Sequence, residues 1–374
     1  MPVDASLATW LRLTLIPGVG GETQRKLLHA FGLPEAVFDA SVSSLRGVVG
    51  ATLAERLLQS DAATTEAIEA ALRWSGEPGN QLVTLADSNY PQALLSSEDP
   101  PILLYLKGRA DILNRPGLAI VGSRNATPQG QANAEAFAAA LAGAGLTIVS
   151  GLALGIDAAA HRGALSVRNE PAGSTIAVIG TGASRIYPAR NHELARSIAQ
   201  HGAIISEFPL ETPAMAANFP RRNRLIAGLA RGCLVVEAAA RSGSLITARL
   251  AAEAGRDVFA IPGSIHAPLS KGCHQLIKQG AKLVESAQDI LEEIGWQSPA
   301  KLAAGPVTDP GAAAIDPAAA QLLAVLGHDP CEIDVLATRS GLTPDMLLAT
   351  LLQLELAGQV ASLPGGRYQR LHRA

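Results

Sequence analysis

The middle of the chain repeats one pattern, in which short apolar runs alternate with Ala-rich segments long enough to form helices. A run with no polar alternation is typical of a strand that is covered on both faces. Helix-length connections between such strands predict βαβ units and an α/β fold with a parallel, doubly wound sheet. The runs are LAIVG (118–122), LTIVSG (146–151), TIAVIG (175–180), AIISE (203–207), CLVVEA (233–238) and DVFAIPG (257–263), followed by KLVES (282–286).

The residues before the sheet have a different pattern. Residues 1–78 show helical apolar spacing, as in LATWLRLTLI and TQRKLLHAF, and predict a domain of helices. Within it, IPGVGGETQRKLL (16–28) is either a helix-hairpin-helix element, whose Gly-rich turn offers N–H groups to phosphate, or a plain tight turn between packed helices. Residues 79–296 then hold the sheet, and residues 297–316, rich in Pro, Ala and Gly, form a linker.

The last residues, 317–374, predict helix, helix, turn, helix and a hairpin around Gly365–Gly366, which is the order of a winged helix. The helix that would read DNA in such a domain, PDMLLATLLQLELAG (344–358), has no Lys or Arg and carries Asp345 and Glu355. Reading a major groove needs basic and amide side chains. We therefore expect this domain to contact protein or to regulate, and not to bind DNA.

Length and charge limit the class of protein. A chain of 374 residues exceeds one ordinary core, so two or three domains are expected. A net charge of −3 excludes a globally basic nucleic-acid coat, although it leaves room for a local basic site. No apolar run approaches the ~18 residues that span a bilayer. The start of the chain has Asp4 and no basic flank, so we expect neither a membrane span nor a signal peptide.

The cysteines form no CxxC pair, which favours buried, reduced thiols in a cytoplasmic protein; they are Cys233, Cys273 and Cys331. His266, Cys273 and His274 lack metal-ligand spacing, and a fourth ligand is not evident. No GxxxxGK[ST] motif occurs either. We therefore expect no metal and no other cofactor.

Nearly every loop that follows a predicted strand carries Gly, Ser or Arg. In a parallel sheet these loops share one edge, where ligands bind. Small residues let backbone N–H groups approach an anion, and the start of the next helix adds a favourable dipole. We therefore predict a phosphate-binding site at this edge. Its candidate residues are Gly122, Ser123, Arg124, Ser150, Gly151, Gly180, Gly182, Arg185, Arg221, Arg222, Asn223, Arg224, Ser242, Gly243 and Ser244.

Residues 218–224, NFPRRNR, concentrate positive charge in a chain that is slightly acidic overall. We expect Asn218–Pro220 to cap a helix that begins near Arg221, which puts the arginines in its first turn. Cations are unfavourable at a helix N-terminus, so local stability does not explain them and an anionic partner does. The alternative is a face whose arginines are solvated or paired with Glu207 and Glu211.

Stretches in unbroken order over about residues 80–290 closely resemble the DNA-processing protein A (DprA/Smf) family. The resemblance implies a Rossmann-like central domain, a helical, sterile-alpha-motif-like N-terminal domain and a winged-helix-like C-terminal domain. It also implies a cytoplasmic protein, not an enzyme, that binds and protects single-stranded DNA, forms a homodimer through the Rossmann-like domain, and loads the RecA recombinase during natural transformation. The stretches are GSR, SGLALGIDAAAHRGAL, VIGTGASRIYPARN, ISEFP, NFPRRNRLIAGLA, VVEAAARSGSLITARLAAEAGRDVFAIPG and SKGCHQLIKQGAKLV.

By motif position, the resemblance places the DNA pocket on Gly122–Arg124, on Arg185 in the loop before Tyr187, and on Arg221–Arg224. Family members often carry a basic residue directly before that Tyr, and Arg185 is the nearest candidate here. The family usually has Asn where this chain has His274, so a backbone contact of that Asn is not carried over.

Aromatic side chains beside these loops have two possible roles, stacking on bases or packing the loops; they are Phe208, Tyr187 and Phe219. A base stack is worth roughly 1–3 kcal/mol. If about three phosphates are neutralised per protomer, the logarithm of the binding constant falls against log salt with a slope of about −2. A dimer would join two such pockets and gain affinity through effective concentration.

Two kinds of enzyme are alternatives. The first is a nucleotide-processing hydrolase of the lysine-decarboxylase-like phosphoribohydrolase type, although its PGGxGTxxE signature is absent. Asp157, His161 and Glu237 would be its acid/base set, and otherwise they cap a helix and brace loops. The second is a dinucleotide-dependent oxidoreductase, in which Glu207 would bind ribose, but GTGASR has Arg185 where the third Gly belongs.

Overall fold

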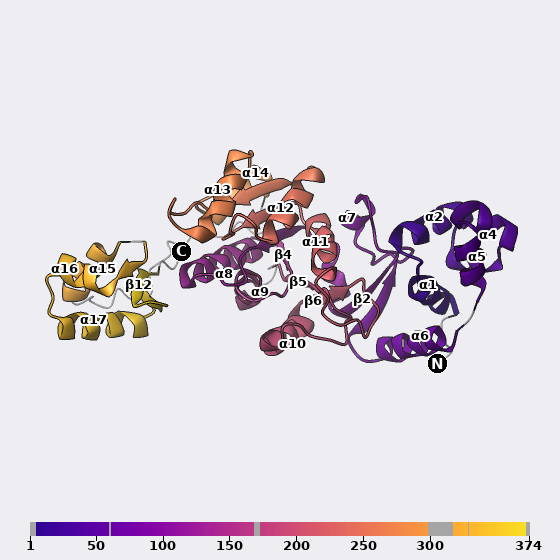
Figure 1. The fold of residues 1–374 in the computed structure, drawn as a ribbon, viewed down its shortest axis with the longest axis horizontal. Helices are drawn as coiled ribbons and strands as arrows, with labels where there is room; N and C mark the ends of the chain where they lie inside the picture. Colours follow the sequence, from indigo (N-terminus) through magenta and orange to yellow (C-terminus); the bar gives the residue numbers. More distant parts are fainter. Residues whose placement is uncertain (1–4, 60, 168–172, 298–316, 328, 372–374) are drawn as a thin grey trace.

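The computed structural model describes residues 5–59, 61–167, 173–297, 317–327 and 329–371. A domain of helices near the N-terminus packs against one end of a central sheet, and further helices cover the two faces of that sheet (Figure 1). Among the described residues, no helix is long and apolar enough to cross a membrane. The three cysteines are free and buried, as predicted.

The N-terminal domain is helical, as predicted, and its core continues into the sheet. Leu27 and Leu57 are buried in the same cluster as Tyr105 of the sheet. The rings of Trp74 and Tyr105 lie edge to face with centroids 5.8 Å apart, a favourable arrangement for an aromatic pair. The helices described between residues 5 and 75 are α1 (Ala5–Leu15), α2 (Gly21–Phe31), α3 (Pro34–Asp39), α4 (Val42–Val49), α5 (Ala51–Leu58) and α6 (Ala62–Ser75).

The described strands of the central sheet follow the order β1-β2-β6-β5-β4-β3-β7-β8-β9. Strands β3 to β9 are parallel, which confirms the prediction. At one edge, β2 pairs antiparallel with β1 and with β6, a feature that the sequence analysis missed. The strands are β1 (Asn80–Thr84), β2 (Leu103–Gly108), β3 (Gly117–Val121), β4 (Thr147–Ser150), β5 (Thr175–Val178), β6 (Ala203–Ser206), β7 (Gly232–Val235), β8 (Asp257–Ala260) and β9 (Lys282–Leu283).

Both faces of this sheet are covered, which explains the continuous apolar runs. Leu118 and Ile120 of β3 pack with Phe137 on one face, whereas Ala119 and Val121 pack into the cluster on the other face. The covering helices are α8 (Pro128–Gly143), α9 (Ile156–Ser166), α10 (His192–His201), α11 (Asn218–Leu229), α12 (Ser244–Glu253), α13 (Lys271–Lys278) and α14 (Ala287–Glu293). Short elements connect them: α7 (Gln92–Leu95), η1 (Ala110–Ile112), η2 (Ala189–Asn191) and η3 (Pro268–Ser270).

The chain reverses its direction of progress across the sheet at β3. From β3 it proceeds through β4 and β5 to β6 on one side, and then returns to β7 on the other side of β3 before continuing to β8 and β9. Loops at the carboxyl ends of β3 and β7 therefore diverge and leave a crevice between them. Such a switch point is where open α/β sheets bind ligands.

The C-terminal region has the order of a winged helix, as predicted. Its helices are α15 (Pro317–Leu326), α16 (Ile333–Ser340) and α17 (Pro344–Leu356). Its strands are β10 (Cys331–Glu332), β11 (Val360–Leu363) and β12 (Arg367–Arg370), in the order β10-β12-β11. Gly365 and Gly366 form the predicted hairpin turn with positive φ angles of 83° and 67°, which glycine adopts without strain.

Candidate functional site

A cleft of about 710 Å³ lies at the switch point. The loops after β3 and β7 and the first turns of α11 and α12 line it. The structure brings eight of the fifteen predicted phosphate-binding residues to its wall: Gly122, Ser123, Arg124, Arg222, Asn223, Ser242, Gly243 and Ser244.

The loop after β3 is held in place by neighbours on both sides. The Ser123 N–H donates to the Glu237 carbonyl at 2.7 Å, and the Ser123 carbonyl accepts from the Ile156 N–H at 3.1 Å. A Cβ at Gly122 would lie 2.6 Å from Cγ1 of Ile156, so only glycine fits there. These contacts hold the loop in place. The side chain of Arg124, the last residue of the motif, is exposed.

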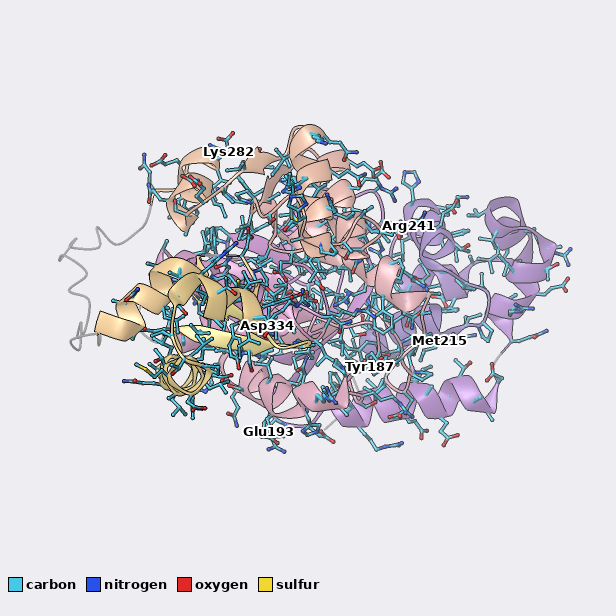
Figure 2. The ribbon with its side chains drawn as sticks, turned by 60° about the vertical axis from the view of Figure 1, so that its left-hand side comes forward. Tyr187, Glu193, Met215, Arg241, Lys282 and Asp334 are labelled. Atoms are coloured by element: carbon cyan, nitrogen blue, oxygen red, sulfur yellow. The ribbon has the colours of Figure 1, made fainter. Side chains whose placement is uncertain are left out.

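The guanidinium of Arg124 lies over one ring of an aromatic pair. Its guanidinium carbon lies 5.3 Å from the centre of the Phe219 ring, which in turn lies 5.7 Å from that of Tyr187. Tyr187, which is labelled in Figure 2, is 48% exposed. A Cβ at Gly180 would lie 2.9 Å from Cδ1 of Phe219, so this glycine makes room for the ring. Within the described chain, Arg124 makes no ion pair, so its charge is available to an anion.

Arg222 forms part of the cleft floor and is only 4% exposed. Its Nη1 donates to the Gly151 carbonyl at 2.6 Å and also to the Val178 carbonyl. Its Nε has no hydrogen-bond partner among the described residues. Burial lowers the pKa of Arg222 to about 10, and the nearby Asp157 carboxylate opposes that shift. Arg222 is thus a buried cation whose hydrogen-bonding capacity is incompletely used.

Asp157 accounts for part of that charge balance. Its carboxylate accepts from the Gly151 N–H at 3.1 Å and the Ala153 N–H at 3.4 Å. Burial raises the pKa of Asp157, while the Arg222 charge lowers it. The predicted helix-capping role is therefore replaced by a role in bracing the loop before α9.

The wall opposite Arg124 is the start of α12. The hydroxyls of Ser242 and Ser244 lie 2.7 Å apart, and the Ser244 N–H faces the Ser242 hydroxyl at 3.4 Å. A Cβ at Gly243 would meet no described atom within 4 Å, so the backbone is open there. A helix N-terminus with an open backbone favours negative charge.

The helix α11 begins earlier than predicted, and its arginines lie on two of its faces. It starts at Asn218 after the N-cap Ala217, and the Asn218 side chain donates to the Gly180 carbonyl at 3.2 Å instead of capping the helix. Phe219, Arg222 and Asn223 consequently line the cleft. Arg221 and Arg224 lie on another face of the helix, at a separate cavity of about 120 Å³ next to the N-terminal domain.

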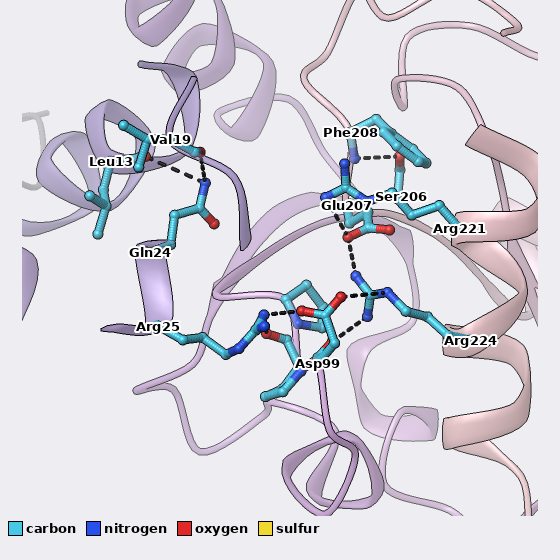
Figure 3. Close-up of polar contacts among 12 residues, drawn as sticks. Leu13, Val19, Gln24, Arg25, Asp99, Ser206, Glu207, Phe208, Arg221 and Arg224 are labelled. Carbon is cyan, nitrogen blue, oxygen red and sulfur yellow. Dashed lines mark hydrogen bonds and ion pairs between the residues drawn. The ribbon is translucent and has the colours of Figure 1, made fainter. Parts of the chain in front are cut away.

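Carboxylates pair with the arginines outside the cleft, so the alternative that the sequence left open is correct for them. Oε2 of Glu207, whose side chain is only 3% exposed, contacts both Arg221 at 3.3 Å and Arg224 (Figure 3). Arg185 pairs with Glu211 at 3.2 Å, and both of these side chains are exposed. The expectation that all of these arginines gather at one site is therefore wrong.

The other predicted residues outside the cleft lie beneath the loops. Ser150 is fully buried and its hydroxyl donates to the Ile120 carbonyl at 2.6 Å. The Gly182 N–H donates to the Thr212 carbonyl at 2.9 Å. Gly151 and Gly180 are also buried, although Gly151 borders a small recess beside the cleft. Burial by the surrounding protein keeps these residues out of the wall of the main cleft.

Of the three aromatic residues predicted to lie beside these loops, one lies outside the cleft and two line it. Phe208 is buried at 4% exposure, and Arg221 lies over its ring at 5.4 Å, so Phe208 packs the loop. Only Tyr187 and Phe219 line the cleft.

Each residue of the acid/base set of the hydrolase alternative is engaged by contacts within the protein. His161 is fully buried, and its Nδ1 lies 2.6 Å from the Thr175 hydroxyl. Burial lowers the pKa of His161 to about 3. Glu237 accepts from the N–H and hydroxyl of Thr127 at 2.9 and 2.6 Å, which braces the start of α8. Within the described residues, no group of His, Cys, Asp or Glu could hold a metal ion.

Asn125 and Thr247 also line the cleft and were missed. Asn125 directly follows Arg124, so extending the predicted loop by one residue would have found it. The Thr127–Glu237 brace joins residues 110 positions apart, a pairing that a sequence pattern does not reveal.

Comparison with known families gives two matches. Residues 81–295 match the family model of DNA recombination-mediator protein A. Residues 306–366 match the model of the DprA winged helix domain.

Individual relatives agree with these matches. Protein Smf of Escherichia coli (strain K12) is 42% identical over 372 residues, which cover 98% of this chain and 96% of that protein. The X-ray structure of DNA processing protein A from Streptococcus pneumoniae has a TM-score of 0.65 and 40% identity, over 76% of this chain and 95% of that one. DNA processing protein A from Helicobacter pylori, studied for its single-stranded DNA binding mode, has a TM-score of 0.51 and 32% identity, over 57% and 95% of the two chains.

Proposed function

The chain belongs to the DNA recombination-mediator protein A family, and on that premise we propose that it binds single-stranded DNA in the cleft between β3 and β7. The observation that carries the proposal is the arrangement of Arg124, unpaired within the described chain, over the ring of Phe219, which contacts the ring of Tyr187, in a cleft that also contains the buried cation of Arg222. Unpaired guanidinium groups bind phosphate, and exposed rings stack on bases.

The same arrangement favours a strand of any sequence. Phosphate contacts position a strand without reading its bases. The open N-terminus of α12 at Gly243 would accept a second phosphate opposite Arg124. A ring such as Tyr187 stacks only on a base that is not already stacked in a duplex, which favours single strands.

We also propose that the protein acts as a homodimer in the cytoplasm and hands incoming DNA to the RecA recombinase during natural transformation. Two clefts on one dimer would bind a single strand more tightly than one cleft alone. The Rossmann-like domain offers a surface for this at its β9 edge, where Leu283 is 45% exposed and the preceding Gly280 and Ala281 line a groove of about 580 Å³. Sedimentation equilibrium tests the dimer, and Leu283→Glu should shift it toward the monomer.

The C-terminal domain fits a different task. Leu348, Leu352 and Leu356 follow one another at helical spacing on α17, and their side chains are 49%, 57% and 82% exposed. An exposed apolar stripe on a helix without cations favours contact with protein over contact with DNA. DNA binding by this domain alone would contradict the assignment.

Titration of the full chain with labelled oligo(dT) and with a duplex of equal length, across a salt series, tests DNA binding. We expect preference for the single strand and a slope of about −2 for about three neutralised phosphates. Tyr187→Leu should weaken binding by roughly 1–3 kcal/mol, whereas the matched control Tyr187→Phe, which keeps the ring, should not. Equal binding of duplex and single strand would contradict the proposal.

We propose no catalytic role for the cleft, because His161 is buried away from it and Glu237 braces Thr127. Incubation with nucleoside monophosphates tests the hydrolase alternative. Release of free base would support the hydrolase alternative.

A further inference from the structure

A chain of ion pairs connects the N-terminal domain to the helix that lines the cleft. Arg25 of α2 contacts Asp99, which is 3.1 Å from Nε of Arg224 on α11. Arg224 also contacts Glu207, which in turn contacts Arg221 (Figure 3). Positive and negative groups alternate along the whole path.

The path is partly sheltered from water. The side chains of Glu207, Arg224 and Arg25 are only 3%, 18% and 24% exposed. Ion pairs that are partly buried are screened less by salt than exposed pairs. The backbone contributes as well, because Arg224 also donates to the Asp99 carbonyl and Arg25 to the Pro100 carbonyl.

The charges of the path do not balance. Asp99 and Glu207 neutralise Arg25 and Arg224, so the fifth member, Arg221, is a surplus cation, and its side chain is 51% exposed. The negative charges of Asp99 and Glu207 are therefore already neutralised by arginines of the protein itself. Their contacts instead fix Arg224, and with it α11, from the side opposite the cleft.

The position of α11 matters because one turn of it supplies both the ring and the floor of the cleft. Phe219, Arg222 and Asn223 all line that cleft, and Arg224 follows directly in sequence. The N-terminal domain rests on the sheet through a separate apolar contact, Trp74 on Tyr105. Breaking the ion pairs would thus loosen α11 without detaching the domain.

We propose that Arg25, Asp99 and Glu207 are positioning residues for the cleft, through which the N-terminal domain holds α11 in the geometry that binds a nucleic-acid strand. None of the three lines the cleft itself. The proposal rests on the proposed function for its effect on DNA, while its effect on α11 is independent of DNA.

Arg25→Gln in the full chain tests this, with Lys26→Gln as the matched control. Lys26 is the next residue of α2 and loses the same charge, and its one ion pair among the described residues is with Glu22 of its own helix. We expect Arg25→Gln to weaken oligo(dT) binding about three- to fivefold, the range of a partly exposed ion pair. Asp99→Asn, which loses both of its partners, should weaken it about tenfold. Arg25→Lys should restore most of the affinity.

Two readouts separate positioning from other roles. A positioning residue leaves the salt slope of binding unchanged, whereas a residue that contacts phosphate lowers its magnitude by about 0.7. Amide hydrogen exchange without DNA should be faster at residues 220–226 in Arg25→Gln than in Lys26→Gln. Equal exchange in the two variants, or a reduced salt slope, would overturn the proposal. Faster exchange in a protein that binds no DNA would support the ion-pair path and remove only the proposed function.

Discussion

The two faces of α11 use arginine in opposite ways. On the cleft face, Arg222 is a buried cation without an ion pair within 4 Å among the described residues, and it lies below Arg124, which is also without one. On the other face, Arg221 and Arg224 share the buried carboxylate of Glu207. A cluster of arginines in a sequence is therefore not one functional unit, because the helix distributes successive residues around its axis. The availability of each charge depends on what the rest of the fold places opposite it.

The strongest test of this contrast is Arg222→Ala. We expect the free energy of unfolding to fall by about 3–5 kcal/mol, because the change leaves the buried carbonyls of Gly151 and Val178 without their donor and the Asp157 carboxylate without a nearby cation. Arg222→Lys, which keeps the charge, should lose less. Urea denaturation measures both. A loss below about 1 kcal/mol for Arg222→Ala would show that this cation does not hold the cleft floor.

A comparison of Arg124→Ala with Arg221→Ala sharpens the contrast for binding. Both side chains are exposed, but only Arg221 has a carboxylate partner. Loss of a charge-assisted contact should weaken oligo(dT) binding roughly 10- to 100-fold in Arg124→Ala. Arg221→Ala should change it less than about fivefold. Neither variant should alter the unfolding midpoint, and an equal effect of the two on binding would break the contrast.

Helix α9 contains a buried group that titrates, whereas the face of α11 away from the cleft is held by ion pairs. The folded-state pKa of His161 is about 3, below its ordinary value of 6.5. Its contribution to stability is therefore present above pH 6.5 and is lost as the pH falls, because the unfolded chain binds the proton first. We expect about 1.4 kcal/mol less stability per pH unit between pH 6.5 and 5. His161→Gln should flatten the profile of unfolding free energy against pH, as measured by urea denaturation at each pH.

The smallest effect is expected at Arg185. Its pair with Glu211 is exposed on both sides and lies outside the cleft. Arg185→Ala should change both stability and oligo(dT) binding by less than about 0.5 kcal/mol. If Arg185→Ala weakened binding as much as Arg124→Ala, Arg185 would belong to the DNA-binding site.

The fold was largely predictable because each of its signals is local. Apolar runs covered on both faces identify the parallel strands, and the loops after β3 and β7 follow directly from them. The antiparallel pair β1–β2 was missed because its partners are separated by the irregular segment around Pro91 and Pro100. That separation hides a hairpin signal, which depends on a short turn.

The site was predictable only in part because it depends on helical phase and on distant partners. Within α11, successive residues point in different directions, and Arg221 and Arg224, which are one turn apart, share a face that lies away from the cleft. The carboxylate of Glu207, the residue directly after β6, forms ion pairs with both arginines. Two glycines that were predicted to let phosphate approach instead make room for side chains of the protein. The guanidinium of Arg222 lies against Gly151, and the ring of Phe219 lies against Gly180.

Those two glycines constrain how this cleft can vary among relatives. The volume that a methyl group would occupy at position 180 already contains the ring edge of Phe219, and the one at position 151 contains the guanidinium of Arg222. A larger residue at either glycine position would therefore have to displace that ring or that guanidinium. A side chain at position 180 is compatible with this cleft only where position 219 carries a smaller group than the ring, whereas loss of the ring requires no change at the glycine.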